Sequence, residues 1–239
     1  YVGLILFFYV GLGLLLFVKQ RSFIYFPTDE VHHEEQEVIF KQDGEELKSI
    51  LINPGKKDAI MYFGGNAETV ALNAEELARV LPNHSIYLVN YRGYGGSTGK
   101  PTERALYSDA LHVFDQVSPL YDQVSVIGRS LGSGIASYLA SKRDIENTAL
   151  VTPFDSIEKI AQRRFPIYPM SILLKDKFSS SARAGKIKSN VLVLIAEEDR
   201  VVPRKHTDNL IKSFGDNPVR VEVFPGAGHD SISQDVSYY

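Results

Sequence analysis

Short apolar runs alternate with helix-length polar segments along most of the chain, and this alternation limits the possible fold more than any other feature. Strands that are apolar on both faces belong to mostly parallel sheets covered by helices on each side. Intervening helical patterns of about 10–15 residues have the length of crossover helices. The sequence therefore predicts an α/β domain with a mostly parallel sheet and helices on both faces. We expect its main strands at 59–63, 85–91, 124–128, 148–152, 191–196 and 219–224.

Turn residues and helical periodicity predict the remaining elements. Asp43 and Gly44 separate the runs 37–41 and 47–52, and an Asp-Gly pair in this position is typical of a β-hairpin. We expect helices at 67–81, 102–117, 131–142 and 203–214. The first of these would present an apolar face made of Val70, Leu72, Leu77, Ala78 and Leu81.

The composition excludes several classes of protein. With 239 residues, 44% of them hydrophobic, the chain can bury a sizeable core and is not intrinsically disordered. The 26 basic and 29 acidic side chains give a net charge of −3, so there is no basic field for a nucleic-acid partner. The absence of Cys excludes disulfide scaffolds, thiol nucleophiles and Cys-ligated metals.

The N-terminal stretch differs from the rest of the chain. Residues 1–18 carry no charge and would span about 27 Å as a helix, close to the ~30 Å hydrocarbon core of a bilayer. Lys19 and Arg21 follow, and then aromatic residues typical of a lipid–water interface. We therefore expect residues 1–26 to form a retained, single-pass membrane anchor with an interfacial segment, and residues 27–239 to form the globular domain.

Two alternatives to a retained anchor stay open, a cleaved signal peptide and a buried helix. The apolar region of a signal peptide is usually about 7–15 residues long and precedes a small-residue cleavage site, which this stretch lacks. The side of the membrane is also open. Lys19 and Arg21 favour a cytoplasmic catalytic domain, but the chain begins at Tyr1 rather than Met, and charges on preceding residues could reverse the orientation.

Residues 128–132 read Gly-x-Ser-x-Gly between a predicted strand and a predicted helix. A nucleophile on such a turn adopts a strained backbone, and the flanking glycines remove the Cβ atoms that would collide there. The start of the helix also places a positive dipole end near Ser130. Ser130 is therefore the candidate nucleophile, and the alternative is a Gly-rich packing turn with an incidental serine.

A nucleophilic serine needs an imidazole base that is oriented by a carboxylate. His229 follows the last strand in a Gly-rich loop and is the candidate base. Asp199, after the strand 191–196, is the candidate acid, with Glu198 and Asp155 as the competing carboxylates. We expect solvated or packed roles for the remaining histidines, His32, His33, His84, His112 and His206.

An oxyanion site needs two backbone donors. One should be the amide of Leu131, the residue after the nucleophile, and the other should come from the loop after the strand 59–63. Asn66 is the first choice in that loop and Gly65 the second. Asn66 can also serve as a helix N-cap at the same time.

Together with these motifs, the segments 63–68 and 90–101 make the chain resemble the alpha/beta-hydrolase superfamily. More narrowly, over about residues 20–232 it is similar to small, membrane-anchored serine hydrolases related to serine aminopeptidase-like and monoacylglycerol-lipase-like members. The resemblance implies an alpha/beta-hydrolase fold and cleavage of esters or thioesters, often of lipids. Two positions depart from the family pattern, because many relatives have His in place of Gly64 and Asp in place of Asn90.

The region 153–190 has the length of a small cap at most. Its eight basic side chains outnumber its acidic ones, which fits either a solvated face or attraction to anionic lipid headgroups. The region also has apolar side chains that could contact lipid or line an acyl pocket, namely Phe165, Ile167, Tyr168, Met170, Ile172 and Leu173.

We therefore predict a serine hydrolase that cleaves carboxylic esters or thioesters, including those of acyl lipids or acylated proteins, through an acyl-enzyme. This chemistry needs no metal or cofactor. The alternatives are an aminopeptidase-like serine peptidase and a non-catalytic, membrane-associated interaction module. The natural substrate, its acyl length and the oligomeric state stay open.

Overall fold

The computed structural model describes residues 1–235 and residue 238, and within them one eight-stranded sheet forms the centre of the molecule. The strand order is β1-β2-β4-β3-β5-β6-β7-β8. The first two strands form the predicted hairpin, β2 pairs antiparallel with β4, and the remaining neighbours are parallel. This arrangement confirms the predicted fold class. The strands are β1 (Gln36–Gln42), β2 (Glu45–Ile52), β3 (Asp58–Phe63), β4 (His84–Val89), β5 (Val124–Arg129), β6 (Asn147–Val151), β7 (Asn190–Ala196) and β8 (Val219–Phe224).

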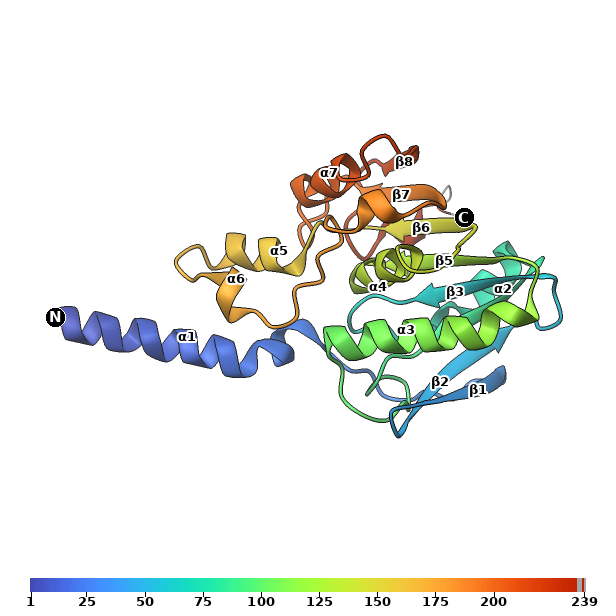
Figure 1. The fold of residues 1–239 in the computed structure, drawn as a ribbon, viewed down its shortest axis with the longest axis horizontal. Helices are drawn as coiled ribbons and strands as arrows, with labels where there is room; N and C mark the ends of the chain where they lie inside the picture. Colours follow the sequence, from blue (N-terminus) through green and yellow to red (C-terminus); the bar gives the residue numbers. More distant parts are fainter. Residues whose placement is uncertain (236–237, 239) are drawn as a thin grey trace.

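Helices cover both faces of this sheet (Figure 1). On one face, α3 (Glu103–Val117), α4 (Leu131–Ala140) and α7 (Arg204–Lys212) contribute to the larger hydrophobic core. On the other face, α2 (Ala74–Val80) packs on the central strands in a second cluster. The strands alternate their side chains between these two layers, so the central strands are buried on both sides, as their unbroken apolar runs require.

The predicted helix over 67–81 is wrong at its beginning. Ala67 has a φ of +61°, a left-handed conformation that cannot continue into a right-handed helix. Helical structure instead begins with a 3-10 turn at Val70–Asn73 and continues as α2. The turn directs Leu72 to solvent, where it is 78% exposed, so Leu72 does not belong to the apolar face predicted for this segment.

The region 153–190 contains two short helices, α5 (Ile157–Arg164) and α6 (Met170–Leu173). The prolines at 166 and 169 fall between them, where the chain turns back. The result is the small cap that the length of this region predicted. Figure 1 shows α5 and α6 extending from the domain beside α1 (Val2–Ile24).

Helix α1 projects from the domain (Figure 1). Most of its apolar side chains are exposed. Among the described residues it is the one helix long and apolar enough to cross a membrane. It extends beyond the predicted apolar run, through Lys19 and Arg21 to Ile24. The boundary between an anchor at 1–26 and a domain at 27–239 remains a prediction.

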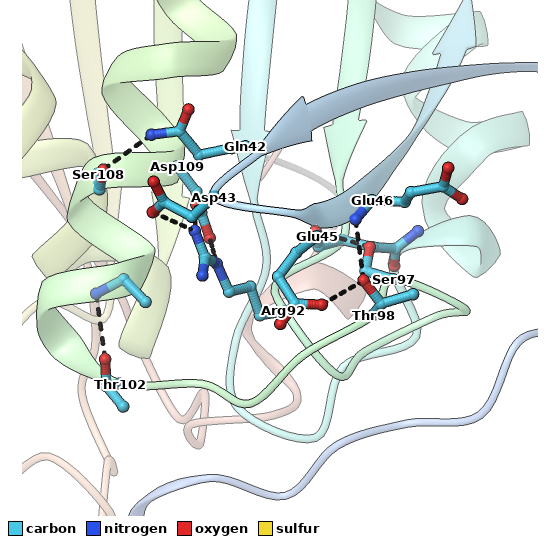
Figure 2. Close-up of polar contacts among 12 residues, drawn as sticks. Gln42, Asp43, Glu45, Glu46, Arg92, Ser97, Thr98, Thr102, Ser108 and Asp109 are labelled. Carbon is cyan, nitrogen blue, oxygen red and sulfur yellow. Dashed lines mark hydrogen bonds and ion pairs between the residues drawn. The ribbon is translucent and has the colours of Figure 1, made fainter.

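The loop that follows β4 is fixed by buried charge and by the hairpin (Figure 2). Arg92 donates two hydrogen bonds to Asp109 on α3, at 2.7 and 2.6 Å, and one to Asp43 in the hairpin turn at 3.0 Å. Burial raises the pKa of Asp109, and the hydrogen bonds from Arg92 oppose that rise. Breaking such a buried pair typically costs about 3–5 kcal/mol.

The same loop also binds the edge of β2. Ser97 Oγ accepts a hydrogen bond from the Lys48 amide at 2.9 Å, and Thr98 Oγ1 accepts one from the Glu46 amide at 2.8 Å (Figure 2). Residues 92–98, which carried much of the family resemblance, therefore have a structural role. Their hydrogen bonds to α3 and β2 hold the loop, and with it Tyr91 and Tyr94, next to the candidate site.

Candidate active site

Ser130 lies on a sharp turn between β5 and α4. Its φ of 49° and ψ of −115° fall outside the ordinary regions for a residue with a side chain, a strain that typically costs about 1–3 kcal/mol. The turn is held because the Ser130 amide donates to the Val151 carbonyl at 2.9 Å. A Cβ on Gly128 would lie 2.5 Å from the Gly132 carbonyl, and a Cβ on Gly132 would overlap the Phe63 carbonyl. Only glycine fits at these two flanking positions.

His229 lies against this serine although 99 positions separate them in sequence. Its Nε2 is 2.8 Å from Ser130 Oγ, and its Nδ1 is 2.7 Å from Asp199 Oδ2. The side chains of His229 and Asp199 are 9% and 5% exposed. These distances are hydrogen-bond distances, so the three side chains form one continuous chain from carboxylate to hydroxyl.

The second oxygen of Asp199 is fixed by the backbone. Oδ1 accepts hydrogen bonds from the amides of Val201 and Val202, at 2.9 and 2.7 Å. The loop that carries His229 is held in turn, because the Glu198 amide donates to the Ala227 carbonyl at 2.9 Å. Both loops follow parallel strands, β7 and β8, and parallel strands place their carboxyl ends at one edge of the sheet.

The competing carboxylates lie elsewhere. Glu198 points to solvent. Asp155 is fully buried and its Oδ1 lies 2.8 Å from Nδ1 of His206, which is itself packed in the interior. Burial acts to raise the pKa of Asp155, but hydrogen bonds from His206 and Asn209 outweigh it, and the pKa is lowered. Asp155 and His206 therefore form a separate buried pair.

The loop after β3 lies beside the serine. A Cβ on Gly65 would be 3.6 Å from the Cβ of Ser130. The Gly65 amide donates to Glu68 Oε2 at 2.5 Å, while Glu68 Oε1 accepts from Tyr62 and Asn73, both at 2.6 Å. The Gly65 amide is thus already engaged, and it is not available as the second oxyanion donor in this arrangement.

Two tyrosines that sequence reasoning did not single out hold this loop. Tyr91 donates to the Gly64 carbonyl at 2.6 Å, and Tyr94 donates to Asn66 Oδ1 at 2.9 Å. Burial raises the pKa of Tyr91 well above its usual range and that of Tyr94 to about 12, so both hydroxyls stay protonated and able to donate. Their only sequence signal was their place in the loop that carried the family resemblance.

A pocket of about 360 Å³ opens over Ser130. Arg129 braces one wall, because its Nη1 lies 3.7 Å from Glu68 Oε2 and its Nη2 donates to the Asp230 carbonyl at 3.3 Å. Phe26, two residues beyond the end of α1, lies on the rim, and its amide donates to Asn66 Oδ1 at 2.9 Å. The lining residues are Phe26, Gly65, Asn66, Ala67, Glu68, Arg129, Ser130, Val201, His229 and Asp230.

This sheet order, with helices on both faces and a serine turn after β5, defines an α/β hydrolase. Residues 98–237 match the model of the Dienelactone hydrolase family, and the chain belongs to that family. It is therefore a hydrolase of the α/β class.

Three curated proteins are similar in sequence. The uncharacterized protein Rv2307c of Mycobacterium tuberculosis is 31% identical over 92% of this chain and 85% of its own length. Lysophosphatidylserine lipase ABHD12 of Gallus gallus is 34% identical over 60% of this chain, which spans 44% of that relative. The uncharacterized membrane protein YNL320W of Saccharomyces cerevisiae is 32% identical over 63% of this chain and 57% of its own length.

Solved structures share the fold at low sequence identity. The Pyrococcus furiosus esterase Pf2001 matches with a TM-score of 0.65 and 16% identity, over 86% of this chain and 89% of that one. Mouse alpha/beta hydrolase domain-containing protein 10 matches with a TM-score of 0.66 and 14% identity, over 85% of this chain and 93% of that one. These structures support the fold assignment.

Proposed function

We propose that the protein is a serine hydrolase that cleaves carboxylic esters or thioesters through an acyl-enzyme. Ser130 attacks the acyl carbon, His229 accepts the serine proton and then donates it to the leaving group, and Asp199 holds the ring in the required tautomer. The observation that carries this proposal is the continuous Asp199–His229–Ser130 hydrogen-bond chain, at 2.7 and 2.8 Å, beneath an open pocket.

The developing oxyanion would be bound by the amides of Leu131 and Asn66. Leu131 is the first residue of α4, where backbone amides have no partner within the helix and the helix dipole is positive. Asn66 lies on the pocket wall, and two hydrogen bonds to its side chain hold it there. Removing one such donor typically costs about 10²–10³-fold in kcat. No step in this mechanism calls for a metal or cofactor.

We also propose that α1 is a single-pass membrane anchor and that the substrate is a lipid ester or a similar acyl compound. The length and exposed apolar surface of α1 support the anchor, as do the two relatives named as a membrane protein and as a lipase. Phe26 supports the substrate class, because it places the pocket rim two residues from the end of α1. A substrate dissolved in the bilayer would reach the pocket over a short path.

Covalent labelling tests the nucleophile. The protein is incubated with a fluorophosphonate and assayed with a series of p-nitrophenyl esters. We expect labelling and turnover for the wild type and for Ser141→Ala, a serine near the other end of α4, and neither for Ser130→Ala. Labelling that survives Ser130→Ala would reject this assignment.

The same preparation separates the ester hydrolase from its alternatives. Aminoacyl p-nitroanilides cleaved faster than the esters would identify a peptidase. A folded protein that reacts with no probe and cleaves no ester would identify a non-catalytic module.

A further inference from the structure

The tip of the cap, residues 165–172, packs against the middle of α1. The rings of Tyr9 and Tyr168 are stacked, with centroids 4.7 Å apart and an interplanar angle of 8°. Tyr9 Oη donates to the Ile167 carbonyl and Tyr168 Oη donates to the Tyr9 carbonyl, each at 2.9 Å. Gly13 leaves room for this ring, because a Cβ there would lie 3.1 Å from it. The cap tip therefore lies level with residues 9–13 of α1.

A second set of contacts fixes the other end of the cap. Gln20 donates to the Leu173 carbonyl at 3.1 Å and accepts from the Lys175 amide at 2.6 Å. Arg21 pairs with Asp176 at 2.9 Å. Residues 175 and 176, at the end of the cap, thus contact residues 20 and 21 near the end of α1. The two sets of contacts define the register between cap and helix, and so the level of the tip along α1.

This register sets a depth for the tip if α1 spans a membrane, so the inference rests on the proposed anchor. Lys19 is the first charge after the apolar run and marks the interface. Gly13 and Tyr9 lie six and ten residues before it, which is about 9 and 15 Å along a helix. One leaflet of the ~30 Å hydrocarbon core is about 15 Å thick. The cap tip consequently lies inside one leaflet.

The side chains exposed on the tip include large apolar ones, as contact with lipid hydrocarbon requires. Ile167 and Ile172 are 66% and 78% exposed, and Phe165 is also exposed. Arg163 and Arg164 precede the tip at the end of α5, and side chains of this length can reach back to the headgroups. Lys175, whose Nζ lies 4.3 Å from the centroid of the Phe17 ring, adds positive charge near the end of the apolar run, where anionic headgroups would lie.

The carbonyls of the tip also suit an environment without water, where an unpaired polar group is costly. All six carbonyls from Phe165 to Met170 accept a hydrogen bond from a protein group. Gln162 Nε2 lies within 3.4 Å of three of these carbonyl oxygens and shares its two N–H groups among them, and Gln162 Oε1 accepts from the Met170 amide at 3.0 Å. Pro166 and Pro169 have no N–H to satisfy.

We propose that residues 165–172 are a second membrane-inserted element, embedded beside α1 in the leaflet next to the catalytic domain. The occupant of this apolar surface is lipid hydrocarbon. Two inserted elements in fixed register would hold the domain in one orientation on the membrane.

Site-directed spin labelling tests the depth directly, and the absence of Cys means that each introduced cysteine is the sole labelling site. Ile167→Cys, Ile172→Cys, Val10→Cys on α1 and Leu120→Cys on the domain surface are labelled with a nitroxide in phosphatidylcholine vesicles. The side chains at 167, 172 and 120 are exposed, so the label does not displace packed groups. Collision with oxygen reports lipid, and collision with a water-soluble nickel chelate reports water.

We expect positions 167 and 172 to collide with oxygen at least several-fold more than with the nickel chelate, as position 10 does, and position 120 to show the reverse. Lipid exposure at 10 with water exposure at 167 and 172 would overturn the inserted cap and leave the anchor standing. Water exposure at 10 as well would reject the proposed anchor. Protection of 167 and 172 from both reagents would indicate contact with protein, such as a second copy of the chain, and would also overturn the proposal.

Discussion

The hydroxyl of Tyr91 donates a buried 2.6 Å hydrogen bond to the carbonyl of Gly64. This bond joins the loop after β4, which Arg92 fixes to α3, to the loop after β3, which borders Ser130. Tyr94 makes the parallel connection to Asn66. The Tyr-Arg-Gly-Tyr segment thus positions the proposed oxyanion loop, and its residues are not among those that line the pocket over Ser130.

Removing the Tyr91 hydroxyl tests this positioning role. We expect Tyr91→Phe to lower kcat for p-nitrophenyl esters about 10-fold with little change in KM, because a displaced oxyanion donor acts on the transition state. Stability should fall by about 1–2 kcal/mol for a lost buried hydrogen bond. Tyr121→Phe, which loses a hydroxyl contact with Tyr87 far from the site, is the matched control and should leave kcat unchanged. Equal kcat effects in the two variants would contradict the role.

Substitutions in the two aspartate–histidine pairs should have different effects, one on activity and the other on stability. We expect Asp199→Asn to lower kcat by about 10⁴-fold while the protein stays folded, because the wrong histidine tautomer would be favoured. Asp155→Asn should instead destabilise the fold by about 3 kcal/mol, because it breaks a fully buried pair with His206, and its folded fraction should keep the wild-type kcat. Kinetics and urea unfolding of both variants check this. A stable but inactive Asp155→Asn protein would show that Asp155 is the catalytic carboxylate and that the assignment of Asp199 is wrong.

The lowered pKa of Asp155 predicts a dependence of stability on pH. A carboxyl whose pKa is lower in the folded than in the unfolded protein stabilises the fold fully above the unfolded value, about 3.9, and loses that contribution as pH falls through the folded value. Lys159, 3.2 Å away, and His206 face the same carboxylate. We expect the difference in unfolding free energy between wild type and Asp155→Asn to shrink as the pH falls below about 4. A difference that grows as the pH falls through that range would contradict the assigned direction.

Close backbone packing at the serine turn predicts intolerance to a single methyl group. A Cβ on Gly132 would overlap the Phe63 carbonyl, so we expect Gly132→Ala to destabilise by more than about 4 kcal/mol or to prevent folding. Gly185→Ala is the control, because its Cβ would meet only the Ser213 carbonyl at an ordinary 3.6 Å. Thermal melts of the two variants check this. A Gly132→Ala protein as stable as wild type would show that the turn is looser than described.

Much of the fold could be predicted because the central strands are unbroken apolar runs in the sequence. Their parallel order then brings the residues after β5, β7 and β8 to one edge, so Ser130, Asp199 and His229 could be proposed together before any coordinates. The catalytic roles of these residues remain a proposal. Asp155 follows β6 at the same edge, and only the packing of α7 reveals that it faces His206.

Other features depend on contacts that no local pattern encodes. The helix start near residue 67 was missed because the positive φ of Ala67 is set by the surrounding loop. The engagement of the Gly65 amide depends on the rotamer of Glu68. The docking of Tyr168 on Tyr9 joins positions 159 residues apart, a separation at which sequence periodicity carries no information.

The most direct test of the central claim is a rapid-quench experiment with p-nitrophenyl acetate. The protein is mixed with excess ester, quenched in acid within milliseconds to seconds, digested, and the peptides are analysed by mass spectrometry. We expect a burst of p-nitrophenol that matches the enzyme concentration, together with one acetyl group on Ser130. Turnover in which Ser130 stays unmodified, or in which the acetyl group is found on another residue, would contradict an acyl-enzyme at Ser130.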